Sequence, residues 1–208
     1  MRYSRYKAMT LIEGLVAIAV MLIAMEGFTQ FFVRSWNTNK FILEEGLASA
    51  AASRATNKII TKLRSVRQAD NGDFPIESGS DFDLKVYIDI DDDGVTERVH
   101  YFLDLVADQL KVGVTNPVGT TPVSYPAADD TVSILTDYVV NENANPVFYY
   151  YNKNYPGDTV NNPLTTPINV EDVRLIRVHL LVNIDPVRAP NNINIESFAD
   201  LRNLKNYE

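Results

Sequence analysis

The pattern of apolar and polar positions divides the chain into parts of different character. Residues 1–8 are polar and basic, and residues 9–33 are almost continuously apolar. Residues 34–70 keep a thinner apolar stripe, and apolar and polar positions alternate in much of 71–208. A segment as long as 9–33 can cross a bilayer about 30 Å thick as a helix. The pattern predicts a membrane-spanning helix that continues as an amphipathic helix and leads into a β-rich domain.

One helix is predicted from Met9 to Gln68, since no proline occurs there and the breakers Asn71-Gly72 follow. At about 1.5 Å per residue it would be roughly 90 Å long. Apolar residues at helical spacing predict its buried face in the second half: Leu43, Leu47, Ile59, Leu63 and Val66. The polar surface is expected to carry the charged residues Lys40, Glu44, Glu45, Arg54, Lys58, Lys62 and Arg67.

A β-hairpin is predicted where apolar residues recur at every second position after residue 81. Asp93-Gly94 fits a two-residue turn, because Asp-Gly adopts the backbone angles that tight hairpin turns need. That turn also sets the register. It pairs Ile88 with Val99, Val86 with Tyr101, Leu84 with Leu103 and Asp89 with Arg98.

Further strands are expected at 109–114, 147–151 and 173–184. In the last of these the buried face would be Ile176, Val178, Leu180, Val182 and Ile184. The proline-containing segments 115–130 and 152–172 are expected to be surface loops. The order of one long helix and then several strands predicts an α+β fold, with a mainly antiparallel sheet packed against the helix.

Composition narrows the function classes. The chain has 208 residues and a net charge of −8, which argues against nucleic-acid binding. It has no cysteine and two histidines, His100 and His179, both in strand patterns where no Ser or Asp can be placed beside them. The aromatic run Phe148–Tyr151 fits a strand with partly buried rings. Nothing resembles a phosphate loop or a nucleophile elbow, so the sequence predicts a protein that is not an enzyme and needs no cofactor.

One candidate for metal binding is the acidic turn at residues 89–97. Asp89, Asp91 and Asp93 occupy the first three ligand positions of a calcium loop, Gly94 follows where such loops turn, and Glu97 stands at the ninth position. The last ligand position holds His100, where a bidentate acid is expected. An acidic hairpin without a metal remains the alternative.

The amino terminus admits three interpretations. A secretory signal would end in a small-residue cleavage site, and the sequence after the apolar run has none. A plain signal anchor explains the basic flank and the length, but leaves the carboxylate of Glu13 unexplained. In the third, processing takes place before the apolar run and not after it.

The third interpretation rests on the stretch Ala8-Met9-Thr10-Leu11-Ile12-Glu13, which follows a short basic leader and precedes a long apolar run. It resembles the class III signal of type IV pilins and type II secretion pseudopilins, whose usual form is Gly-Phe-Thr-Leu-Ile-Glu. Ala8, Met9 and Gly14 depart from that pattern. The resemblance implies that a prepilin peptidase cleaves the leader 1–8 after Ala8 and N-methylates Met9.

In this family the glutamate is thought to meet the terminal amine of a neighbouring subunit during assembly, and Glu13 takes that place. A carboxylate in hydrocarbon needs a positive partner, and cleavage creates one at Met9. The alternative is that Glu13 only reaches the bilayer surface near the helix end.

The resemblance implies a minor pilin or pseudopilin, a structural subunit at or near the tip of a type II secretion pseudopilus or a type IV pilus. The segments 145–151 and 173–204 are similar to minor pseudopilins of the J type. The expected partners are I- and K-type minor subunits, a major subunit, prepilin peptidase and membrane lipid around residues 9–33. The basic flank predicts an inner-membrane protein with a cytoplasmic amino terminus and an extracytoplasmic domain at 71–208. The rival hypothesis is an anchored, adhesin-like binding module, calcium-dependent or not, that forms no fibre.

Overall fold

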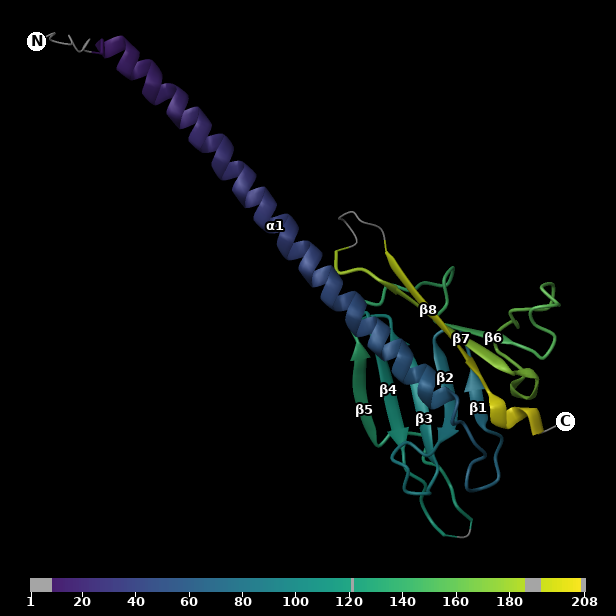
Figure 1. The fold of residues 1–208 in the computed structure, drawn as a ribbon. Coiled ribbons are helices and arrows are strands. Elements are labelled where there is room, and N and C mark those ends of the chain that lie inside the picture. Colours follow the sequence, from purple (N-terminus) through teal and green to yellow (C-terminus); the bar gives the residue numbers. More distant parts are fainter. Residues whose placement is uncertain (1–8, 121, 186–191, 207–208) are drawn as a thin grey trace, which may run out of the picture. The chain divides into compact units, whose positions relative to one another are not determined.

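The computed structural model describes residues 9–120, 122–185 and 192–206 (Figure 1). The chain divides into two compact units, Met1–Glu44 and Glu45–Glu208. The leader 1–8, which includes Ala8, lies outside the described residues. A single helix, α1 (Leu11–Leu63), contributes to both units. The predicted α+β class, a long amino-terminal helix packed against antiparallel sheet, is confirmed.

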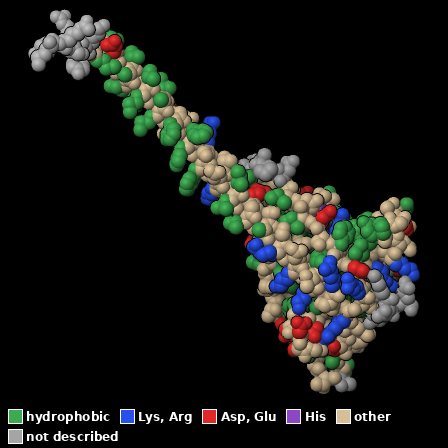
Figure 2. Space-filling model, in the orientation of Figure 1, with side chains coloured by type: hydrophobic (Ala, Val, Ile, Leu, Met, Phe, Trp, Pro, Cys, Tyr) green, Lys and Arg blue, Asp and Glu red, His purple; other side chains and the backbone are tan. Residues whose placement is uncertain are grey.

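The first unit consists of the first part of α1 and the residues before it. Its apolar side chains are exposed from Met9 to Trp36, as in Leu11 at 87% and Phe31 at 71%, whereas Phe41 is buried. Figure 2 shows them as hydrophobic side chains along the upper helix. This helix is long and apolar enough to cross a membrane by length and composition.

The second unit combines the end of α1 with two antiparallel sheets (Figure 1). The five-stranded sheet has the order β1-β2-β3-β4-β5, with β1 (Ile76–Gly79), β2 (Asp83–Ile88), β3 (Glu97–Asp104), β4 (Gln109–Thr115) and β5 (Thr131–Thr136). The three-stranded sheet has the order β6-β7-β8, with β6 (Phe148–Tyr151), β7 (Leu175–Val182) and β8 (Ile193–Asp200). Two short 3-10 helices are η1 (Val170–Asp172) and η2 (Arg202–Asn206).

One hydrophobic core joins the end of the helix to both sheets. Ala52, Ile59 and Leu63 of α1 are fully buried in it. Inward and outward positions alternate along each strand, and the inward side chains enter the core. The first sheet contributes Leu84, Val86, Val99, Tyr101, Leu110 and Val112. The second contributes Phe148, Tyr150, Ile176, Val178, Leu180 and Val182. The predicted inward face of β7 is confirmed for these last four residues.

The helix ends earlier than predicted. α1 stops at Leu63, where the sequence predicts Gln68. The chain leaves the helix because its next backbone groups find partners elsewhere: the Arg67 N–H donates to the Tyr87 carbonyl of β2, and Val66 is buried in the core. Tertiary contacts therefore override a sequence without a local breaker.

The predicted buried face is correct for the carboxyl-terminal part of the helix and wrong for the part before it. Ile59, Leu63 and Val66 are buried, but Leu43 and Leu47 are more than 60% exposed. The step from Leu47 to Ile59 rotates about 120° around the helix at 100° per residue, so these residues cannot share one face. The buried side instead passes through small residues, Ala52 and Ala55, which let the strands approach closely.

The hairpin of β2 and β3 is confirmed, but its register differs by two residues. Val86 pairs with Val99 and Ile88 with Glu97, so residues 89–96 form a longer connection than a two-residue turn. Asp92 and Gly94 both have positive φ, at 63° and 96°. The shift is an even number of residues, so each side chain keeps the predicted face.

Three strands, β1, β5 and β8, were not predicted. All three are edge strands, and β5 and β8 also have many exposed positions and no continuous apolar face. These segments are strands because they pair with a neighbouring strand, and not because their apolar and polar residues alternate. The described residues of 116–130 and 152–172 form loops, as predicted, apart from the isolated bridge between Val118 and Ser124 and the 3-10 helix η1, and Thr115 belongs to β4.

Candidate functional site

A capping box begins the helix at the candidate assembly residue. The Thr10 N–H and hydroxyl both donate to Glu13 Oε2 at 2.9 Å, and the Glu13 N–H faces the Thr10 hydroxyl oxygen at 3.4 Å. The first helical hydrogen bond runs from the Gly14 N–H to the Thr10 carbonyl. Thr10 is thus the N-cap and Glu13 the third helical residue, an arrangement that satisfies otherwise unpaired backbone N–H groups.

This role of Glu13 is one that the sequence analysis missed. The Ser/Thr-x-x-Glu spacing is a recognised start signal for helices, and Thr10-Leu11-Ile12-Glu13 has it. The capping box involves only Oε2 of the carboxylate. The second oxygen, Oε1, has no hydrogen-bond partner within the described chain. Met9, the residue that cleavage would expose, is 69% exposed beside this site.

The candidate metal residues lie in the connection between β2 and β3. Carboxylate oxygens of Asp89, Asp91 and Glu97 lie within 4.8 Å of one another. Asp93, a predicted ligand, is not part of this group, and Glu97 replaces it. Burial raises the pKa of the Glu97 carboxyl, opposed by a hydrogen bond from the Ile90 N–H and aided by the nearby Asp91 charge.

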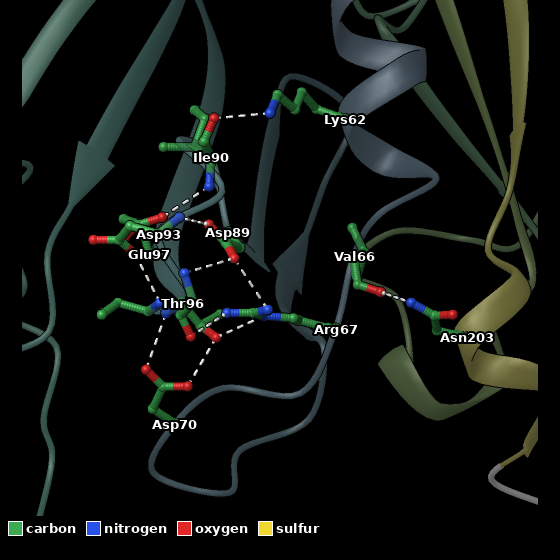
Figure 3. Close-up of polar contacts among 12 residues, drawn as sticks. Lys62, Val66, Arg67, Asp70, Asp89, Ile90, Asp93, Thr96, Glu97 and Asn203 are labelled. Atoms are coloured by element: carbon green, nitrogen blue, oxygen red, sulfur yellow. Dashed lines mark hydrogen bonds and ion pairs between the residues drawn. The ribbon is translucent and has the colours of Figure 1, made fainter.

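Two of these carboxylates, those of Asp89 and Glu97, have partners within the chain (Figure 3). The two oxygens of Asp89 accept the N–H groups of Asp93 and Gly94, both at 3.1 Å. Arg67 pairs with Asp89 at 3.2 Å, and Glu97 accepts the Ile90 N–H at 2.8 Å. Hydrogen bonds and one arginine therefore hold this part of the acidic connection.

The segment after α1 is tied to this connection. Arg67 donates to the Thr96 hydroxyl and the Gly94 carbonyl, both at 2.9 Å. Asp70 accepts both the N–H and the hydroxyl of Thr96. Lys62 reaches the Ile90 carbonyl, and Asn203 donates to the Val66 carbonyl (Figure 3). These contacts fix the exit of the helix between the two sheets.

A second polar cluster surrounds His100 on the outer face of the first sheet. Its Nε2 lies 2.5 Å from an Asp83 oxygen, and its Nδ1 lies 2.9 Å from an Asp129 oxygen. The prediction that no Asp could be placed beside His100 is therefore wrong. Asp129 comes from a loop that the strand pattern does not position, so its approach cannot be read from spacing. Arg98, 4% exposed, lies 3.7 Å from Asp129 and 3.5 Å from Glu77.

The environment of His100 stabilises its charged form. Burial alone would lower the pKa of His100, but the hydrogen bonds to Asp83 and Asp129 outweigh it and raise that pKa. No hydroxyl group bonds to the ring within the described chain, so the cluster lacks a nucleophile for acyl transfer. It ties β2 and β3 to the segment before β5. The other histidine, His179, faces the Pro146 carbonyl at 3.2 Å.

Comparisons with known proteins give no relative. No protein-family model, no curated protein and no solved structure matches the chain.

Proposed function

We propose that the chain is a minor pilin or pseudopilin, a subunit that prepilin peptidase processes and that assembles at or near a filament tip. The supporting observation is the Thr10-Leu11-Ile12-Glu13 motif at the first turn of a 53-residue helix whose first half exposes its apolar side chains. Exposed apolar surface of this extent requires a covering of lipid or of other helices. A filament subunit uses both, first in the membrane and then in the fibre.

The proposed arrangement in the membrane is a single pass of the inner membrane, with the amino terminus cytoplasmic and the second unit extracytoplasmic. Its partners are the major subunit, I- and K-type minor subunits, prepilin peptidase and membrane lipid around residues 9–33. The role of the protein is structural, without enzymatic activity.

Glu13 has two separable roles in this proposal. One oxygen caps its own helix through Thr10, and the other pairs with the N-methylated amine of Met9 on a neighbouring subunit. The first role starts the helix, and the second selects correct docking, because an unpaired intramembrane charge is strongly penalised.

Two variants separate these roles in cells that make the filament. Glu13→Gln keeps a hydrogen-bonding side chain but removes the charge, so it should insert into the membrane and fail to enter fibres. Thr10→Ala removes the cap but keeps the charge, so it should still be incorporated. The measurement is the amount of subunit in sheared fibres relative to the membrane. Normal incorporation of Glu13→Gln would refute the pairing.

A second candidate function, an anchored calcium-dependent binding module, is favoured by the carboxylates of Asp89, Asp91 and Glu97 within 4.8 Å. Calcium bound there would raise the unfolding midpoint of the full chain in detergent micelles. Asp91→Asn should abolish the rise, whereas Asp92→Asn, next to the group, should keep it. An unchanged midpoint of the wild-type chain with and without calcium removes this candidate.

A further inference from the structure

A pocket of about 560 Å³ opens at one end of the three-stranded sheet. It forms where β6 has just ended and β7 begins, and Leu175 and Asp200 of its lining are paired across β7 and β8. Its charged lining residues are Lys153, Arg174 and Asp200. A concave site of this size with few convergent polar groups is typical of ligand binding.

Arg174 is held in place at this pocket by backbone carbonyls of the residues that precede it. Its Nη1 group donates to the carbonyl oxygens of Glu171, at 2.6 Å, and Val173, at 2.9 Å. These bonds use one side of the guanidinium group, whose other donors can still serve a ligand. A guanidinium fixed in this way loses little conformational entropy when an anion binds.

A row of aromatic rings continues from the pocket across the outer face of the sheet, and Tyr151 within it is buried. The ring of Tyr155, in the pocket lining, lies 4.3 Å from that of Tyr151, which lies 6.3 Å from that of Phe198. In the neighbouring row the guanidinium of Arg177 stacks on Tyr149 at 3.9 Å from the ring centre. Phe198 is 37% exposed, although it is a large apolar side chain.

The pocket also differs in charge from the first sheet and its loops. Residues 70–144 contain sixteen acidic and three basic residues. The pocket has two basic residues and one acidic residue, and Arg177, outside its lining, pairs with Glu196 at 3.5 Å. A negatively charged ligand would be repelled by the first sheet and attracted to this end of the second one.

We propose that this pocket binds an acidic segment of a partner protein, with a carboxylate between Lys153 and Arg174 and the segment continuing over Tyr155 and Phe198. Arginine and aromatic residues are the side chains that dominate binding energy at protein interfaces. Charge-assisted bonds from arginine to a carboxylate are short and strong. The proposal rests on the proposed function, in which partner subunits meet this domain.

The test measures binding of two capped octapeptides to the full chain in detergent micelles by fluorescence anisotropy. One alternates Glu with Thr, and the other alternates Gln with Thr. The Glu peptide should bind at least about tenfold more tightly. Lys153→Gln, Arg174→Gln and Tyr155→Ala should each weaken it at least about fivefold, whereas Lys58→Gln, which removes an exposed helix cation, should change it by less than about twofold.

Equal affinity for both peptides would overturn the proposal, and so would the same loss in Lys58→Gln as in the pocket variants. Tighter binding of a uronic-acid tetrasaccharide than of the Glu peptide would assign the pocket to an acidic sugar and also overturn it. Arg174 bonds to the carbonyls of Glu171 and Val173, so Arg174→Gln can fail to fold; Lys153→Gln and Tyr155→Ala then keep the test valid. Cleavage before Met9 is measured separately, so failure of this proposal is distinct from failure of the proposed function.

Discussion

Gly113 lies opposite His100 in the pairing of β3 and β4, and Asp129 reaches the histidine across it. A Cβ atom at residue 113 would lie 2.1 Å from an Asp129 carboxylate oxygen. Any larger residue must therefore displace that carboxylate from both His100 and Arg98. The glycine makes room for the charge cluster and is not needed for a turn.

Gly113→Ala should accordingly destabilise the second unit by about 1–3 kcal/mol, the usual effect of overpacking. The measurement is the free energy of unfolding of the full chain in detergent micelles. Gly46→Ala is the matched control, because nothing lies within 4 Å of a Cβ there and alanine favours a helix. If the two variants unfold alike, Gly113 has no such role.

Glu45 is a charged residue predicted on the polar surface of the helix and found buried, at 6% exposure. Neither of its carboxylate oxygens has a hydrogen-bond partner in the described part of the chain. Burying a polar group without a partner costs about 1–3 kcal/mol. Glu45→Leu, of similar size, should therefore raise the free energy of unfolding by about that amount. A clear loss of stability in this variant would show that the carboxylate is satisfied.

At the scale of elements, the β2–β3 hairpin shows what local sequence can and cannot define. Alternation identified both strands and their inward faces, and Asp-Gly marked the connection. The register depends on Asp89, whose carboxylate accepts two N–H groups of the connection and pairs with Arg67 from beyond the helix. That arginine is distant in sequence, so a turn rule could not foresee its effect.

The clamp formed by Asp83, His100 and Asp129 should make stability depend on pH. The pKa of His100 is raised in the folded chain, so its contribution is complete below the unfolded value of about 6.5 and disappears as pH rises through the folded value. The wild-type chain should lose stability relative to His100→Gln over that window. Lys85, opposite His100 on β2, and Arg98 also carry charge on this face.

Unfolding free energies measured between about pH 5 and pH 9 test this clamp. The difference between wild type and His100→Gln should shrink as pH increases. Asp83→Asn, which removes one of the two carboxylates, should move that change to lower pH. A difference that is constant over the range would contradict the linkage.

For the whole molecule, the α+β fold class and the candidate membrane anchor could be predicted, because both depend on long-range periodicity. The apolar run and the Thr-Leu-Ile-Glu motif are continuous in sequence, and the long helix beginning at Leu11 was expected from them. The second sheet, the His100 cluster and the pocket near Arg174 were not foreseen, since each combines residues from distant segments. Local sequence patterns cannot predict a site in which a loop residue such as Asp129 contacts a strand residue such as His100.

The central claim is that this chain is processed before its apolar segment and then assembled, and the intact mass of the protein from its native cells tests it most directly. The account predicts a chain that begins at Met9 and carries one additional methyl group. A chain that retains residues 1–8 in cells with active prepilin peptidase would contradict it.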